Sequence, residues 1–108
     1  MREVHVNTND IEWQNAMEYP VGIMEKILCD GSGNAPKSCL LKMKPGWEMD
    51  EHVHVYTELH YVLEGEYESQ GRIYPAGTFR LIPKHVNHGP FKSDTGAIIF
   101  VVWVELHH

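Results

Sequence analysis

Two histidines and a glutamate stand close together near the middle of the chain. His52 and His54 are one residue apart, and Glu58 follows four residues after the second histidine. Side chains at positions i and i+2 of a β-strand project to the same face, so both imidazoles can reach one point in space. Imidazole nitrogen and carboxylate oxygen are ligands that borderline divalent metals accept. The spacing therefore predicts a site for a divalent metal ion.

Three more histidines, His60, His85 and His88, lie near this group in the sequence. His60 has the same parity as Glu58, so a regular strand would turn it inward, as a hydrogen-bonding neighbour of a ligand or as a proton shuttle. A bulged strand would instead leave it on the surface. Arg80 lies in an apolar segment, where burial requires a partner or an anionic ligand, and otherwise it faces outward. The two histidines that end the chain resemble the start of an expression tag and take no part in the argument.

The elements that position these residues read as short strands between Gly, Pro and Asn turns. Strands are expected at 22–29, 38–44, 52–56, 58–63, 66–70, 78–82 and 97–104, with turns at Gly65, Gly71, 75–77 and Pro83. Helix signals are limited to one short turn within residues 9–17. Short strands at even spacing are typical of an antiparallel sandwich or barrel. Because the histidines lie on otherwise hydrophobic strands, the pattern favours a small barrel that holds a ligand inside.

Length and charge narrow the classes of function. A chain of 108 residues is expected to form one domain, 1–108. The net charge of -6 and the scattered basic residues argue against nucleic acid and anionic membranes as partners. The longest apolar run is too short to span a bilayer and no secretory signal is visible, so we expect a cytoplasmic protein. Cys29 and Cys39 flank a turn-rich loop and could pair across a hairpin, but free thiols suit that compartment better.

The segment 46–65 resembles the first motif of the cupin superfamily. That motif is a glycine, five residues, His-x-His, three or four residues, a glutamate, six residues and a glycine, and it is matched here by Gly46, His52, His54, Glu58 and Gly65. The looser second motif is matched within 71–88 by Pro75, Gly77, Pro83 and His88, without its usual asparagine after the histidine. The upstream part, with an N-terminal extension over 1–20, is similar to ChrR-like cupins, a group that includes the metal-binding domain of zinc anti-sigma factors.

This resemblance implies an all-β antiparallel jelly-roll barrel with negligible helix, open at one end, that pairs into a homodimer. It also implies one divalent ion, Zn, Fe, Mn or Ni, inside the barrel, with His52, His54, Glu58 and His88 as ligands. His85 is the alternative to His88 as the fourth ligand, since both follow Pro83, and the family spacing favours His88. Glu58 could instead be a solvated surface carboxylate, because some cupins use only histidines.

Such a ligand set would leave a divalent ion with a net charge of about +1 and with open coordination positions. We therefore expect a mononuclear metalloenzyme, dioxygenase-like or otherwise metal-assisted, that acts on a small oxygenated, anionic molecule, with His60 and His85 as candidate acid/base groups. The alternatives are a metal-dependent sensing or small-molecule-binding module that needs another chain, and a purely structural cupin, because one fold hosts many functions.

Overall fold

The computed structural model describes residues 1–50, 52–53, 56–88 and 90–104, and at 52–53 and 87–88 it describes the backbone alone. The strands are β1 (Gln14–Asn15), β2 (Ile23–Asp30), β3 (Lys37–Met43), β4 (Trp47–Met49), β5 (His52–Val53), β6 (Thr57–Ser69), β7 (Arg72–Pro75), β8 (Phe79–Ile82), β9 (Asn87–His88), β10 (Phe91–Ser93) and β11 (Ala97–Val104). Two short 3₁₀ turns, η1 (Thr8–Asp10) and η2 (Ser32–Asn34), are the helical segments of the described residues. The expected all-β class with negligible helix is confirmed.

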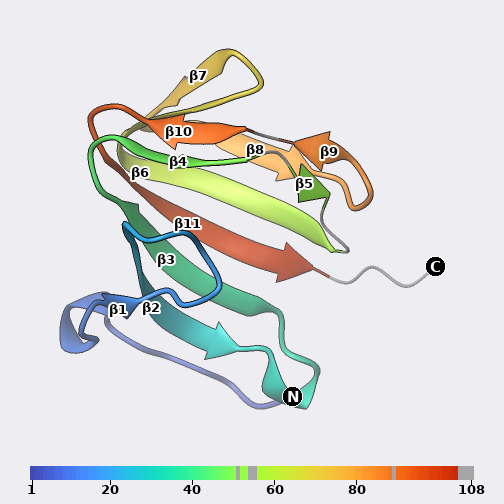
Figure 1. The fold of residues 1–108 in the computed structure, drawn as a ribbon. Coiled ribbons are helices and arrows are strands. Elements are labelled where there is room, and N and C mark those ends of the chain that lie inside the picture. Colours follow the sequence, from blue (N-terminus) through green and yellow to red (C-terminus); the bar gives the residue numbers. More distant parts are fainter. Residues whose placement is uncertain (51, 54–55, 89, 105–108) are drawn as a thin grey trace.

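One curled antiparallel sheet carries most of these strands. Its order is β1-β2-β3-β11-β6-β10-β4, with β7 and β8 also paired to β6, while β5 and β9 form a separate two-stranded ladder. Figure 1 shows β1, β2 and β3 at one end of this sheet and β4 and β10 at the other, with β11 and β6 between them. Because the sheet curls, the two ends enclose an interior, which is the expected cupin barrel in the form of a half-barrel.

The strand β6 differs from the expectation, which placed a turn at Gly65 between two strands. That prediction is wrong, because β6 runs without a break through Gly65. Its first part pairs with β8 and β11, and its last part pairs with β7 and β10. Gly65 has φ +69°, and a Cβ there would overlap the carbonyl oxygen of Gly96. A glycine is therefore needed here because two backbone segments lie very close together within the sheet, and not because the chain makes a hairpin turn.

A β-bulge lies two residues before this glycine. The register between β6 and β11 passes from Val62 to Glu64 and leaves Leu63 without an opposite residue. β6 therefore has one residue more than β11 over this stretch. After the extra residue, the positions of β6 that face the interior change from even to odd residue numbers. The buried residues of β6 are Thr57, Glu58, His60 and Val62 before the bulge and Tyr67 and Ser69 after it.

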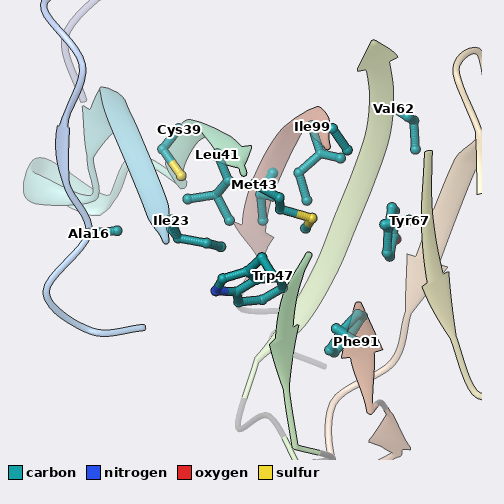
Figure 2. Close-up of a cluster of buried hydrophobic side chains, with 12 residues drawn as sticks. Ala16, Ile23, Cys39, Leu41, Met43, Trp47, Val62, Tyr67, Phe91 and Ile99 are labelled. Carbon is teal, nitrogen blue, oxygen red and sulfur yellow. The ribbon is translucent and has the colours of Figure 1, made fainter. Parts of the chain in front are cut away.

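Apolar side chains from both ends of the sheet fill the interior. Members of the buried cluster are Ala16, Ile23, Cys39, Leu41, Met43, Trp47, Val62, Tyr67, Phe91, Ala97, Ile99 and Val101. Figure 2 shows Ile23, Met43 and Trp47 directed toward the same interior space, with Tyr67 and Phe91 farther along it. Trp47 is buried and Trp103 packs against the cluster, so both lie where hydrophobic burial stabilises the fold.

The hairpin of β2 and β3 settles the state of the two cysteines. Cys29 lies opposite Ser38 and Cys39 lies opposite Ile27, and both thiols are free. The expected pair of free thiols is therefore confirmed. Among the described residues, no helix combines the length and apolar character needed to cross a bilayer.

Candidate functional site

The ladder of β5 and β9 brings together two expected ligands that are far apart in the sequence. His52 lies directly opposite His88, and Val53 lies opposite Asn87. Figure 1 shows this ladder at the end of the molecule where β6 begins and β11 ends. The third expected histidine ligand, His54, lies outside the described residues.

Glu58 stands near the start of β6, opposite Ile82 of β8. Its side chain is buried, with 2% of the residue exposed. The alternative that Glu58 is a solvated surface carboxylate therefore does not hold. Burial of a carboxylate costs free energy unless hydrogen bonds or a cation offset the lost hydration. A metal ion bound by Glu58 would be such a cation.

His60 follows on the same face of β6 and is 5% exposed, so the inward alternative for this residue is the observed one. Its Nε2 lies 3.0 Å from Oε1 of Glu58, and its Nδ1 lies 2.8 Å from the hydroxyl oxygen of Tyr67. Burial, followed by the nearby Arg80 cation, lowers the pKa of His60 to about 3. The ring is therefore neutral at pH 7 although a carboxylate lies beside it.

Arg80 lies on β8 opposite His60 and is half-buried on the interior side. Its Nη1 donates a hydrogen bond of 3.0 Å to the hydroxyl oxygen of Tyr67. The guanidinium carbon lies 4.0 Å from the centre of the Tyr74 ring, within the range of a cation–π contact. Of the two alternatives for Arg80, burial with a partner is therefore the observed one, and the partners are tyrosines.

The sequence did not single out Tyr67 among the tyrosines of the chain. Strict alternation from Glu58 and His60 would turn residue 67 outward, and the bulge at Leu63 turns it inward instead. The signal that could have revealed this is Gly65, read as a glycine within a strand rather than as a turn.

A hollow in the interior opens beside these polar groups. It contains about 330 Å³ of space that is partly open to solvent. Its wall consists of Tyr19, Ile23, Leu41, Met43, Trp47, Met49, Glu58, His60, Phe91 and Ile99. A mostly apolar wall with one carboxylate and one imidazole is typical of a site for a small molecule.

His85 is placed differently from the other candidates. It is exposed, has φ +65°, and lies on the turn between β8 and β9. It is not among the described residues that line the hollow. A chemical role for His85 stays a prediction.

The metal site itself also stays a prediction. Within the described residues, no three His, Cys, Asp or Glu side chains are grouped so as to hold an ion. The side chains of His52, His54 and His88 lie outside that description. The chemistry of the set fits a divalent transition metal, because nitrogen and oxygen donors without sulfur suit Zn, Fe, Mn and Ni.

Comparison with solved structures finds the same fold in several bacterial proteins. An RmlC-like cupin from Shewanella frigidimarina has 23% identity and a TM-score of 0.79, over 94% of this chain and 90% of that one. An acetylacetone dioxygenase from Acinetobacter johnsonii has 13% identity and a TM-score of 0.75, over 96% and 74%. The anti-sigma protein ChrR of Rhodobacter sphaeroides, solved in complex with SigE, has 20% identity and a TM-score of 0.70, over 91% and 52%.

Comparison with individual curated proteins gives no match. The family model described as the ChrR cupin-like domain, by contrast, matches residues 1–107, which is nearly the whole chain. The resemblance seen in the two sequence motifs is therefore confirmed, and the chain belongs to the ChrR cupin-like family.

Proposed function

We propose that this protein binds one divalent transition-metal ion through His52, His54, Glu58 and His88 and acts as a mononuclear metalloenzyme on a small oxygenated molecule. The observation that carries the proposal is the pairing of His52 with His88 across β5 and β9. Residues directly opposite each other in an antiparallel pair share one face of the sheet. The burial of Glu58 beside the hollow supports the carboxylate as the remaining ligand.

The donor set determines what a bound ion would supply. When bound, a divalent ion with open positions is a Lewis acid that polarises an oxygen atom of the substrate. Metal affinity falls as the pH falls through the histidine range, because a protonated imidazole cannot ligate. Zn and Ni bind more tightly than Fe in vitro, so the ion found after purification need not be the ion used in the cell.

The hollow supports a small substrate. It contains about 330 Å³ of space, part of it open to solvent, behind a mostly apolar wall that also carries Glu58 and His60. A residual charge of about +1 on the site favours an anionic or dicarbonyl-like ligand, and the apolar wall strengthens that attraction by excluding water. Two histidines are candidates for proton transfer, His85 on the exposed turn and His60 beside Glu58.

The test is reconstitution of the metal-free protein with Zn, Fe, Mn or Ni in separate samples. Dicarbonyl, hydroxy-acid and phenolic compounds are then screened, with dioxygen consumption and substrate loss recorded. We expect turnover that depends on which ion was supplied, and none in His52→Ala treated in the same way. His5→Ala is the matched control, because His5 is exposed and remote from both motifs. If no reconstituted form turns over a compound or binds it more tightly than the metal-free protein does, the enzyme proposal fails.

The second candidate is a sensing module in which the metal or a small ligand changes contact with another chain. The similar structure of ChrR in complex with SigE supports this alternative. The hollow beside Glu58 leaves space for a substrate, which favours the enzyme over a module that senses the metal alone. Metal-dependent binding of a partner chain without turnover would favour the sensing module.

We also propose a homodimer located in the cytoplasm. The outer face of β6 and β8 supports the dimer, because Tyr61 lies opposite Phe79 and both are exposed, at 42% and 60%. Leu63 and Leu81 extend this surface, which we call the outer apolar face (Tyr61, Leu63, Phe79 and Leu81). Large exposed apolar surfaces mark interaction sites. The two free thiols support a reducing compartment.

A further inference from the structure

A continuous chain of hydrogen bonds runs from Arg80 to the candidate ligand Glu58. Nη1 of Arg80 lies 3.0 Å from the Tyr67 hydroxyl oxygen, which lies 2.8 Å from Nδ1 of His60. Nε2 of His60 lies 3.0 Å from Oε1 of Glu58. The proposed function uses Glu58 as a ligand and His60 as a candidate for proton transfer, so Arg80 and Tyr67 remain without a role.

The groups at the two ends indicate the direction of the bonds in this chain. A guanidinium only donates, so the Tyr67 oxygen accepts from Arg80 and its own hydrogen is available to His60. A carboxylate only accepts, so Nε2 of His60 carries the ring proton and Nδ1 accepts from Tyr67. That proton is donated to Glu58. The opposite tautomer would set the lone pair of Nε2 against a carboxylate oxygen at 3.0 Å, which is repulsive.

The surrounding elements hold each member of the chain in place. Arg80 and His60 are directly opposite each other on β8 and β6. Tyr67 reaches the interior because of the bulge at Leu63, and its ring packs against Phe91 with centroids 5.9 Å apart. Tyr74, opposite Tyr67 on β7, lies under the guanidinium. In the described part of the chain, Arg80 forms no ion pair with a carboxylate, so its fork is free to donate to Tyr67.

We infer that Arg80, Tyr67 and His60 are positioning residues that fix the orientation in which the Glu58 carboxylate meets the metal. The inference rests on the proposed metal site. His60 acts here through Glu58, since one of its ring nitrogens contacts Tyr67 and the other contacts Glu58. Hydrogen bonds behind a metal ligand orient it, and their loss commonly lowers metal affinity roughly 10- to 100-fold.

The first test needs no mutation. Long-range ¹H–¹⁵N correlation spectra of the metal-free wild-type protein distinguish the two neutral tautomers of each histidine ring. We expect His60, assigned by comparison with His60→Gln, to carry its proton on Nε2 at pH 7. A proton on Nδ1, or a doubly protonated ring, would break the deduced direction of the chain and overturn the inference.

The second test removes one hydroxyl group. Tyr67→Phe takes away the donor to His60 Nδ1, while Tyr61→Phe removes a hydroxyl from the exposed outer side of the same strand. Metal affinity is measured by competition with a chromophoric chelator, and the near-ultraviolet circular dichroism of each metal-free variant reports its folding. We expect metal binding roughly 10- to 100-fold weaker in Tyr67→Phe and unchanged in Tyr61→Phe.

Arg80→Lys and Arg80→Gln extend the test to the far end of the chain. Lysine keeps one donor for Tyr67 and should retain more of the metal affinity than glutamine does. If the wild-type protein binds no metal, the proposed function and this inference fall together. If it binds metal and Tyr67→Phe binds it equally well, only the positioning inference is overturned.

Discussion

At the scale of single residues, the burial of Glu58 has opposite effects on the stability of the metal-free protein and on its affinity for a metal ion. A carboxylate that is 2% exposed loses most of its hydration, and the hydrogen bond of 3.0 Å from His60 offsets part of that loss. A cation beside the carboxylate would offset more of it. The charge of Glu58 should therefore cost more free energy in the metal-free protein than in the metal-bound one.

Glu58→Gln separates these two effects. The amide keeps an oxygen for a hydrogen bond but has no charge, so metal affinity should fall, though less than in His52→Ala, which loses a ligand altogether. The metal-free variant should be as stable as the wild type or more stable by about 1 kcal/mol, because a buried charge is removed. Chemical denaturation and chelator competition measure the two quantities. The control is Glu48→Gln, which alters an exposed carboxylate of β4 and should change neither the stability nor the metal affinity. Equal metal affinity in Glu58→Gln and the wild type would argue against Glu58 as a ligand.

Residue parity predicted part of this site from the sequence. The spacing of His60 to Glu58 offered its inward direction as one of two alternatives, and the structure places both side chains in the interior. The partner Tyr67 could not be predicted in this way, because counting by twos across Leu63 gives the wrong face. A single inserted residue thus decides which tyrosine reaches the site, and alternation alone does not reveal an insertion.

At the scale of elements, β6 connects the site to the rest of the sheet. One half of this strand carries Glu58 and His60, and the other half carries Tyr67, with the bulge and Gly65 between them. The local geometry at Gly65 therefore controls whether Tyr67 lies next to His60 in the interior.

Gly65→Ala should be strongly destabilising. The new Cβ would meet the carbonyl oxygen of Gly96 in a backbone conformation that alanine disfavours, and the two costs together are about 3 kcal/mol or more. Gly71→Ala is the matched control, since Gly71 also has a positive φ, +76°, but has open space around it. Its cost should be about 1 kcal/mol. Urea denaturation of both variants measures the difference, and equal losses of stability would contradict the close-approach explanation.

The strand pattern was predictable where strands are long and was missed where they are short. The expected range 97–104 coincides with β11, whose partners on both sides explain its apolar sequence. The short strands β1, β4, β7 and β10 were not predicted, although β8 was, because alternation is hard to see over so few positions. Their pairing depends on contacts made by the folded sheet.

At the scale of the whole molecule, the curled sheet leaves one side enclosing the hollow and the other carrying the outer apolar face. Burial of that face against a second copy of the chain would remove exposed aromatic and aliphatic surface from water. The sequence alone implied a dimer only through the resemblance to cupins. The exposed pair Tyr61 and Phe79 gives that expectation a physical location.

Phe79→Lys should convert the dimer to monomer, because it places a charge in the centre of the proposed contact. Ile73→Lys is the control, since Ile73 is similarly exposed, at 57%, but lies on β7 outside the outer apolar face. Light scattering coupled to size exclusion reports the molar mass of each variant. A monomeric wild type at working concentrations, or a dimer that persists in Phe79→Lys, would contradict this location of the interface.

The most direct test of the account is the metal content of protein purified without a nickel column and without the two terminal histidines. Elemental analysis should find about one divalent ion per wild-type chain and nearly none in His52→Ala and His88→Ala, whose residues are paired across β5 and β9. His5→Ala and His85→Ala, which alter exposed histidines, should keep the wild-type ratio. A wild-type chain that binds no ion, or His52→Ala and His88→Ala variants that retain theirs, would contradict the proposed metal centre.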